Sequence, residues 1–285
     1  MTTIGTTIGT TIGTTIRTTI GAPADSVRSA DGTMIAFERR GSGPALILVD
    51  PAGGYREFDN IRELGKLLAA SFTVFTYDRR GRGASTDTPP YAIEREVDDL
   101  AALVAAAGGS ANVYAFSSGG LLALHAAAAG LAIERLALFE PPIGTDADQS
   151  ADADLRTEIA TLVAAGRRGD AAQHFLSSIG VPPEVIAQLG PGKRALESVA
   201  HTLVYDCLIA EATSLALVAT VTTPTLVLDS QGSSGNLTGW AATVAEALPN
   251  GTHRSLVGEW HGVPDDDLAP VLAEFFLDSN PRRTR

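Results

Sequence analysis

The sequence is poor in several features that mark large classes of protein. Its 285 residues include a single cysteine, Cys207, so no internal disulfide is expected and a reducing, cytoplasmic compartment fits. No run of about 18 apolar residues occurs, so we expect no segment that spans a membrane. The five histidines are scattered and show no HExxH or paired-ligand spacing. We therefore expect no metal site, and no cofactor is implied.

Basic residues are also scarce, at 21 Lys and Arg against 33 Asp and Glu, which gives a formal net charge of −12. Nucleic acids and anionic membranes are bound through clustered Lys and Arg, so neither is expected as a partner. A small-molecule substrate is the expected partner. Hydrophobic residues make up 45% of the chain and charged residues 19%, so a sizeable core can be buried.

The first residues form a repeat. Residues 2–21 contain five copies of a four-residue unit, four of them TTIG and one TTIR. Threonine and glycine are poor helix formers, and one isoleucine in four buries little apolar surface. We expect residues 1–24 to be a low-complexity, disordered tail. The alternative is an edge strand or a self-association segment, because isoleucines spaced by four share one strand face.

After the tail, short apolar runs alternate with longer helical stretches. Two strands joined by the Asp31-Gly32 turn come first, followed by apolar runs at 45–50, 72–78, 112–116, 133–140, 223–229 and 252–259. Helices are expected near 55–70, 94–107, 118–129, 238–247 and 266–277. This alternation predicts an α/β fold with a mostly parallel central sheet and helices on both faces.

The alternation breaks between the apolar runs at 133–140 and 223–229. Residues 145–220 are mostly helical and are expected to form a lid over the carboxyl edge of the sheet, where open α/β sheets bind ligands. The core would then comprise residues 25–144 and 221–280.

Four loop segments carry a resemblance to a known family. They are VDPAGG (49–54), YDRRGRGAS (77–85), AFSSGG (115–120) and GEWHG (258–262), each following a predicted strand. With LFEPP (138–142) and VLD (227–229), they make the chain similar to the α/β-hydrolase superfamily, and to an actinobacterial-type branch of its serine hydrolases. The resemblance implies the α/β-hydrolase fold with a helical lid. It does not select a substrate, because this superfamily hosts many reactions.

The resemblance implies a nucleophile and a base. The family pattern G-x-S-x-G places Ser117 at the nucleophile position, with Ala115 where the first glycine is usual. The alternative is that Ser117 and Ser118 only cap the following helix. His261, in the loop after the last strand, occupies the position of the general base. The other four histidines are expected to be surface or packing residues.

The usual acid is missing. In most members an aspartate follows the penultimate strand, but the register here reads Ser230, Gln231, Gly232, Ser233, with no carboxylate until Glu246. Glu140, at the end of the sixth strand, is the favoured substitute. Asp229, at the end of the seventh strand, is the alternative, and the sequence does not decide between them.

The oxyanion hole would use the backbone N–H groups of Ala52 and Ser118. Asp50 raises a difficulty, because a carboxylate near a developing oxyanion opposes it unless the side chain points away. Asp78 and Arg79 are interpreted as an ion-paired structural turn. Further substrate contacts are expected from the residues Asp50, Gly53, Phe116, Phe175 and Tyr205.

These observations favour a serine hydrolase that cleaves an ester, thioester or lactone of a small to medium apolar acyl group through an acyl-enzyme. Two alternatives stay open, and Asp50 and the missing acid motivate the first. One is a non-hydrolytic enzyme on the same site, such as a biosynthetic cyclase or a cofactor-free haloperoxidase. The other is a catalytically inactive member that only binds a ligand.

Overall fold

The computed structural model describes residues 25–56, 61–143, 146–188 and 191–278. The predicted tail, residues 1–24, lies outside this described part of the chain. The same holds for residues 57–60, which belong to the predicted helix at 55–70.

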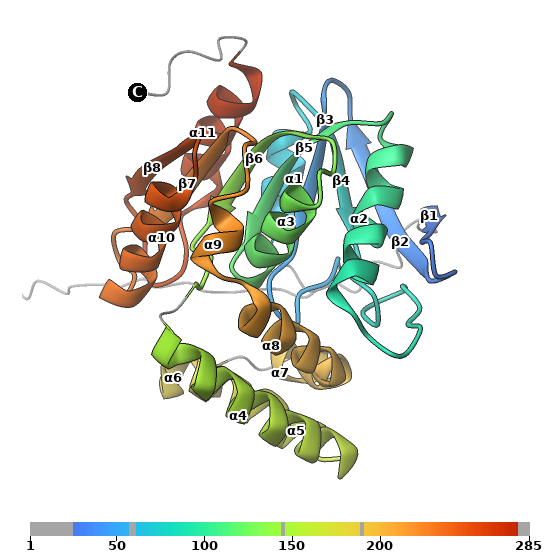
Figure 1. Cartoon of the computed structure of the whole chain (residues 1–285), viewed down its shortest axis with the longest axis vertical. Coiled ribbons are helices and arrows are strands. Elements are labelled where there is room, and N and C mark those ends of the chain that lie inside the picture. The colour runs from blue at the N-terminus through green and yellow to red at the C-terminus, as the bar shows by residue number, and fades with distance from the viewer. Residues whose placement is uncertain (1–24, 57–60, 144–145, 189–190, 279–285) are drawn as a thin grey trace, which may run out of the picture.

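A sheet of eight strands runs through the described residues in the order β1-β2-β4-β3-β5-β6-β7-β8 (Figure 1). The bounds are β1 Asp25–Arg28, β2 Met34–Gly41, β3 Ala45–Val49, β4 Thr73–Tyr77, β5 Ala111–Phe116, β6 Ile133–Phe139, β7 Thr225–Ser230 and β8 Gly251–Leu256. β2 pairs antiparallel with β1 and β4, and all other neighbours are parallel. The mostly parallel sheet and its leading hairpin are therefore confirmed.

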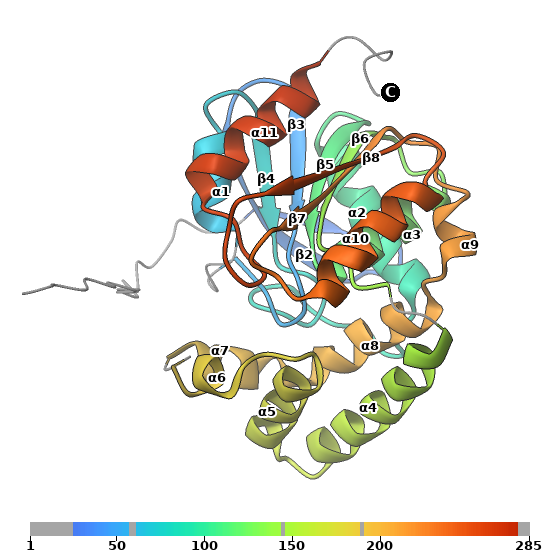
Figure 2. The same cartoon turned by 90° about the vertical axis from the view of Figure 1, so that its left-hand side faces the viewer.

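Helices cover both faces of the sheet because successive strand residues point to opposite sides. In β5, for example, Val113 and Ala115 join one core while Tyr114 joins the other. The first core lies under α2 (Ile93–Ala106), α3 (Ser118–Ala128) and α10 (Gly235–Ala247), and the second under α1 (Arg62–Leu68) and α11 (Asp265–Leu277) (Figure 2). No helix among the described residues is long and apolar enough to cross a membrane.

The first of these helices is shorter than predicted. The sequence suggests a helix over 55–70, whereas α1 begins at Arg62. Arg56 instead belongs to the loop after β3, where its backbone N–H donates a hydrogen bond to Asp78 Oδ1 at 2.8 Å. The carboxylate of Asp78, which follows β4, therefore accepts the Arg56 N–H in place of a helical carbonyl.

Between β6 and β7 the chain forms a separate group of helices, which we call the cap. It consists of α4 Asp146–Ala164, α5 Arg168–Ser178, α6 Pro183–Gln188, α7 Pro191–Ser198, a 3₁₀ turn Ala200–Thr202 and α8 Leu203–Ala212 (Figures 1 and 2). The cap has an apolar interior of its own, onto which Ala52 and Tyr55 pack. These two residues follow β3, so the cap covers the carboxyl end of the sheet. A short helix, α9 (Leu215–Val218), then leads to β7.

Candidate active site

Three residues in the described part of the chain have a positive φ without being glycine: Ser117 at 52°, Glu140 at 46° and His261 at 53°. A Cβ atom makes this region unfavourable, and each such residue costs about 1–3 kcal/mol. Ser117 and Glu140 directly follow β5 and β6, and His261 lies in the turn after β8. Backbone strain collects at functional sites, so these positions define the candidate active site.

Ser117 lies at the sharp turn from β5 into α3. Its φ and ψ are 52° and −126°, and its backbone N–H donates to Phe139 O at 2.8 Å. The turn brings α3 very close to the end of β3, because a Cβ on Gly119 would lie 2.6 Å from Asp50 O. Ala115, at the family's first glycine position, is fully buried in the core, which accommodates its methyl group. The helix-cap alternative gains no support, since Ser117 makes no side-chain capping hydrogen bond to α3.

His261 lies in a tight turn after β8. The turn is closed by the Glu259 N–H, which donates to Gly262 O at 2.9 Å. The imidazole packs against Phe116, the neighbour of Ser117, with ring centroids 4.7 Å apart. Within the described residues, Ser117 Oγ makes no hydrogen bond to the ring. Such contacts in free enzymes are often long and tighten only when substrate binds.

Glu140 is the carboxylate that contacts His261. Its Oε2 lies 2.5 Å from Nδ1 of His261, and its Oε1 accepts a hydrogen bond from the Ser230 N–H at 2.8 Å. The residue is fully buried. Burial raises the pKa of Glu140, but hydrogen bonds from His261, Ser233 and Ser230 outweigh it, so the pKa lies below its usual value. The carboxylate is thus ionised at neutral pH and able to orient the ring.

Asp229, the alternative acid, has other partners. It is buried, and it hydrogen bonds to His253 Nε2 and, at 2.5 Å, to Ser255 Oγ. Both partners lie on β8, where Asp229 pairs with Ser255 in the strand register. The structure therefore does not bring Asp229 to His261, and the alternative assignment is corrected: this carboxylate joins two strands.

Two serines support the Glu140–His261 pair, and sequence reasoning did not assign them a role. Ser233 Oγ accepts a hydrogen bond from the His261 N–H at 2.9 Å. Ser230 donates its N–H to Glu140, and its Oγ donates to Glu259 O at 2.6 Å. The sequence did mark them. They are the first and last residues of the segment 230–233, in which the family's usual aspartate is missing.

The segment after β3 forms a four-residue turn, closed by the Gly54 N–H donating to Pro51 O at 3.0 Å. Gly53, third in the turn, has φ of 69°, as a type II turn requires. Ala52 is the second residue of the turn. The N–H of Ser118 lies in the first turn of α3, where no intrahelical acceptor exists.

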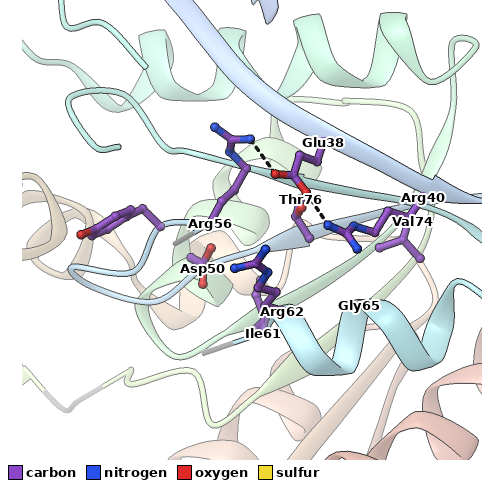
Figure 3. Close-up of a pocket in the computed structure, with 10 residues that line it drawn as sticks. Glu38, Arg40, Asp50, Arg56, Ile61, Arg62, Gly65, Val74 and Thr76 are labelled. Carbon is purple, nitrogen blue, oxygen red and sulfur yellow. Dashed lines mark hydrogen bonds and ion pairs between the residues drawn. The ribbon is translucent and has the colours of Figure 1, made fainter. Parts of the chain in front are cut away.

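Asp50 faces a pocket on the β4 side of β3. This pocket is bounded by β2, β4 and α1, and the residues Glu38, Arg56 and Arg62 are among those that line it (Figure 3). Asp50 is 1% exposed, and neither carboxyl oxygen has a hydrogen-bond partner among the described residues. Burial raises the pKa of this carboxyl to about 7, despite the opposing charges of Arg82 and Arg79. Asp50 therefore holds a proton through the lower part of the neutral range, which weakens its opposition to a nearby oxyanion.

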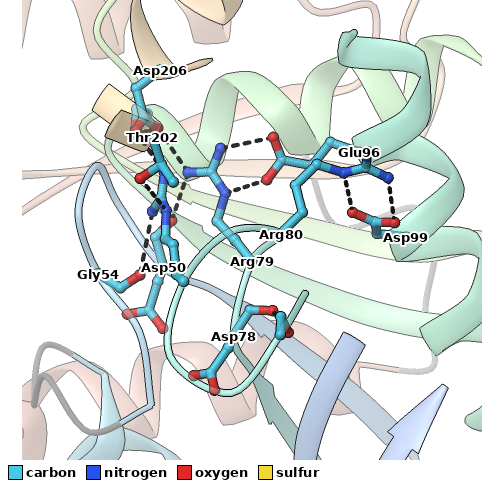
Figure 4. Close-up of polar contacts among 12 residues, drawn as sticks. Asp50, Gly54, Asp78, Arg79, Arg80, Glu96, Asp99, Thr202 and Asp206 are labelled. Atoms are coloured by element: carbon cyan, nitrogen blue, oxygen red, sulfur yellow. Dashed lines mark hydrogen bonds and ion pairs between the residues drawn. The ribbon is translucent and has the colours of Figure 1, made fainter. Parts of the chain in front are cut away.

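A buried ion cluster, part of which is shown in Figure 4, contacts the turn after β5, because Ser118 Oγ donates to Asp206 Oδ1 at 3.0 Å. Arg79 and Arg82, from the turn after β4, are 0% and 1% exposed. Arg79 pairs with Glu96 at 2.6 Å, and both arginines pair with Asp206 of α8, at 2.8 and 2.6 Å. Burial raises the pKa of Glu96, but the charge and hydrogen bonds of Arg79 reverse this effect and lower it. The Arg79–Glu96 pair is therefore charged on both sides.

Asp78 is also ion-paired, and its partner is Arg56. Its Oδ2 lies 2.9 Å from Arg56 Nη2 and accepts a hydrogen bond from the Ala84 N–H at 2.8 Å. Arg79 turns instead toward Glu96 and the cap. The interpretation of Asp78 and Arg79 as ion-paired, structural residues agrees with these contacts.

Two predicted substrate contacts have partners of another kind. Tyr205 stacks on Tyr91, with ring centroids 4.0 Å apart, and donates to Asp87 Oδ2 at 2.7 Å. Phe175 is buried in the apolar interior of the cap. These contacts give both residues a structural place in the cap and at its contact with the core.

Gly53 and Phe116 have contacts that also differ from a simple substrate role. A Cβ on Gly53 would lie 2.1 Å from Leu196 Cδ1 of α7, so this glycine lets the cap approach the turn after β3. Phe116 supports the imidazole of His261. Among the described residues, no group of three or more His, Cys, Asp or Glu side chains is placed to hold a metal ion.

The sequence model of the alpha/beta hydrolase family matches residues 37–274. Since this range covers more than half of the chain, the protein belongs to the alpha/beta hydrolase family, and it is classed among hydrolases. The predictions of family and fold are confirmed, while the actinobacterial-type branch stays a prediction.

Solved structures agree with this placement. An alpha/beta hydrolase from Sphaerobacter thermophilus DSM 20745 is 45% identical, with a TM-score of 0.82 over 88% of this chain and 100% of that chain. A thermophilic esterase from Thermogutta terrifontis is 22% identical, with a TM-score of 0.72 over 90% of this chain and 98% of that one. An enol-lactonase from Burkholderia xenovorans LB400 is 18% identical, with a TM-score of 0.72 over 89% and 100%. At these lower identities the last two establish the fold alone.

A curated protein, the "Uncharacterized hydrolase YraK" of Bacillus subtilis (strain 168), is 36% identical over 97 residues. The aligned segment covers 33% of this chain and 35% of that protein. The match therefore spans about a third of the length of this relative.

Proposed function

We propose that the protein is a serine hydrolase in which Ser117 is the nucleophile, His261 the general base and Glu140 the acid that orients the base. The observation that carries this proposal is the coincidence of strain and contact. The three non-glycine residues of the described chain with positive φ are these three, and two of them are joined by the 2.5 Å contact between Glu140 and His261.

In acylation, Nε2 of His261 takes the proton of Ser117 while Oγ forms a bond to the substrate carbonyl carbon. The carbonyl oxygen becomes an oxyanion, which the N–H groups of Ala52 and Ser118 stabilise. The imidazolium then gives its proton to the leaving group, whose bond to carbon breaks. Ionised Glu140 stabilises the imidazolium during both steps.

In deacylation, water attacks the acyl carbon and its proton passes to His261. A second oxyanion forms in the same hole and collapses, releasing the carboxylic acid and returning the proton to Ser117. The substrate, one water molecule and the named residues account for every bond and proton in both steps.

For the substrate, we propose an ester, thioester or lactone with a small to medium apolar acyl group. The apolar interior of the cap packs onto Ala52, the proposed oxyanion-hole donor, which favours an apolar acyl group. The similarity in fold to an esterase and an enol-lactonase is compatible with this class.

The Asp50 observation bears on the alternatives. A non-hydrolytic reaction was considered because a carboxylate beside the oxyanion hole opposes acyl transfer. The raised pKa of Asp50 and its position toward the β4-side pocket reduce that objection. The contact of Glu140 with His261 similarly supplies the acid that the usual register lacks, and favours an active enzyme over an inactive binding member.

A fluorophosphonate probe tests the proposal. Ser117 Oγ forms a bond to phosphorus, fluoride leaves, and His261 accepts the proton. Labelling should be lost in Ser117→Ala but retained, at a lower rate, in Ser118→Ala, and wild-type enzyme should turn over p-nitrophenyl esters only when Ser117 is intact. Absence of labelling in the folded wild-type protein would overturn the proposal.

A further inference from the structure

One carboxylate of the cap reaches under the nucleophile turn. Asp206, on α8, is 2% exposed, and its Oδ1 accepts hydrogen bonds from Ser118 Oγ at 3.0 Å and from Arg79 Nη1 at 2.8 Å. Its Oδ2 accepts from Arg82 Nη2 at 2.6 Å. Asp206 thus joins the cap to the residue that follows the nucleophile and to two arginines of the core. Its place beside Arg79 is visible in Figure 4.

The same two arginines hold the other side of the oxyanion hole. Arg82 Nη1 donates to Pro51 O at 2.8 Å and to Gly54 O at 3.3 Å. Arg79 Nη1 lies 3.4 Å from Asp50 O. The guanidinium groups of Arg79 and Arg82 therefore hold carbonyl oxygens in and around the turn that contains Ala52. The carboxylate of Asp206 holds both guanidinium groups.

The charge of Asp206 is important to this arrangement. Arg79 has a second carboxylate partner in Glu96, but Asp206 is the one carboxylate in ion-pair contact with Arg82 among the described residues. Removing one partner of a buried ion pair leaves the other charge uncompensated, which is strongly destabilising. Loss of the Asp206 charge would therefore release Arg82 from the carbonyls around Ala52.

We propose that Asp206 is a positioning residue for the oxyanion hole: it holds Ser118 directly and the turn around Ala52 through Arg79 and Arg82, so that both N–H groups face one point. This inference rests on the proposed serine hydrolase function. It also makes the hole dependent on the cap, since Asp206 is a cap residue. Displacement of α8 would separate Asp206 from Ser118 and from both arginines at once.

Kinetics of p-nitrophenyl acetate hydrolysis test this role. Asp206→Asn is expected to lower kcat by about ten- to a hundred-fold with little change in KM, because the loss falls on the transition state. Ser118→Ala removes only the hydrogen bond to Asp206 and is expected to lower kcat less. The double variant should be no worse than Asp206→Asn, because Ser118 acts through the same carboxylate. Glu211→Gln, which removes the 2.7 Å ion pair of Glu211 with Arg156 within the cap, is the matched control on α8 and should leave kcat unchanged.

A trifluoromethyl ketone provides a readout that a purely structural role would not move. Ser117 Oγ adds to its carbonyl carbon, the proton passes to His261, and the resulting oxyanion occupies the hole. Its inhibition constant should rise in parallel with the loss of kcat in Asp206→Asn and Ser118→Ala. The matched secondary alcohol, which forms no oxyanion, should bind all variants equally.

Unchanged kcat and ketone affinity in both variants, or a change in KM alone, would overturn the positioning role. If Asp206→Asn does not fold, Ser118→Ala decides by the same two measurements. If Ser117→Ala hydrolyses the ester at the wild-type rate, the serine hydrolase proposal itself is overturned. Failure of that proposal can therefore be told apart from failure of the positioning role of Asp206.

Discussion

The backbone N–H of His261 donates a hydrogen bond to Oγ of Ser233 at 2.9 Å, at the sequence position where the family's aspartate is usual. A neutral hydroxyl therefore occupies this place and holds the backbone of the histidine loop. The negative charge comes from Glu140, which directly follows the neighbouring strand β6 and whose Oε2 contacts Nδ1 of the ring. The acid has moved between strands while the imidazole keeps a carboxylate partner.

Replacement of Glu140 by glutamine should be the most damaging carboxylate change at the site. Glu140→Gln removes the charge that stabilises the imidazolium, and we expect kcat for p-nitrophenyl esters to fall about a hundred- to ten-thousand-fold. Asp229→Asn is the matched control, because it changes an equally buried carboxylate that contacts β8 instead. Its kcat should stay within about three-fold of the wild type, and equal losses in both variants would contradict the assignment of Glu140.

A carboxylate restored at the usual position should recover part of this loss. In the Glu140→Gln background, Ser233→Asp places a carboxylate where the hydroxyl now contacts the His261 loop. We expect at least about a ten-fold gain in kcat over Glu140→Gln, because an ion close to the imidazole again favours its charged form. Gln231→Asp, on the exposed neighbour two residues earlier, should give no gain, and recovery with Gln231→Asp alone would count against this reasoning.

The positions of Ser117 and His261 could be predicted from sequence because each belongs to a local motif that follows a strand. The choice between Glu140 and Asp229 could not, since both end buried strands at the same edge of the sheet. Their roles depend on which side chain meets the loop after β8, and this is a tertiary contact. The same applies to Asp206, which lies 124 residues from its partner Arg82 and has no local pattern that marks it.

Asp50 should make the stability of the protein depend on pH. Its pKa is about 7 in the folded protein against an ordinary value of 3.8. Between these values the unfolded state loses the proton while the folded state keeps it, so the free energy of unfolding falls as pH rises from about 4 to about 7. The penalty is absent below this window and complete above it.

Asp50→Asn should therefore raise the melting temperature at pH 8 and have little effect near pH 4. The gain in free energy of unfolding at pH 8 is expected to be several kcal/mol at most, since one pKa unit corresponds to about 1.4 kcal/mol. Chemical denaturation at pH 4, 6 and 8 measures it, with the exposed Asp98→Asn as the control. A gain independent of pH would show that the carboxyl does not titrate in this window.

A side chain at Gly53 should destabilise the protein while the cap is in place. A methyl group there would lie 2.1 Å from Leu196 Cδ1, and the φ of 69° is unfavourable for alanine. We expect Gly53→Ala to lower the free energy of unfolding by about 1–3 kcal/mol and to displace the neighbouring N–H of Ala52, which reduces kcat. Leu196→Ala alone should cost about 2–5 kcal/mol because its side chain is buried. In the double variant the clash between the new methyl group and Leu196 is absent. Its loss in free energy of unfolding should therefore be smaller than the sum of the two single losses. Strictly additive losses would exclude this clash as the cause.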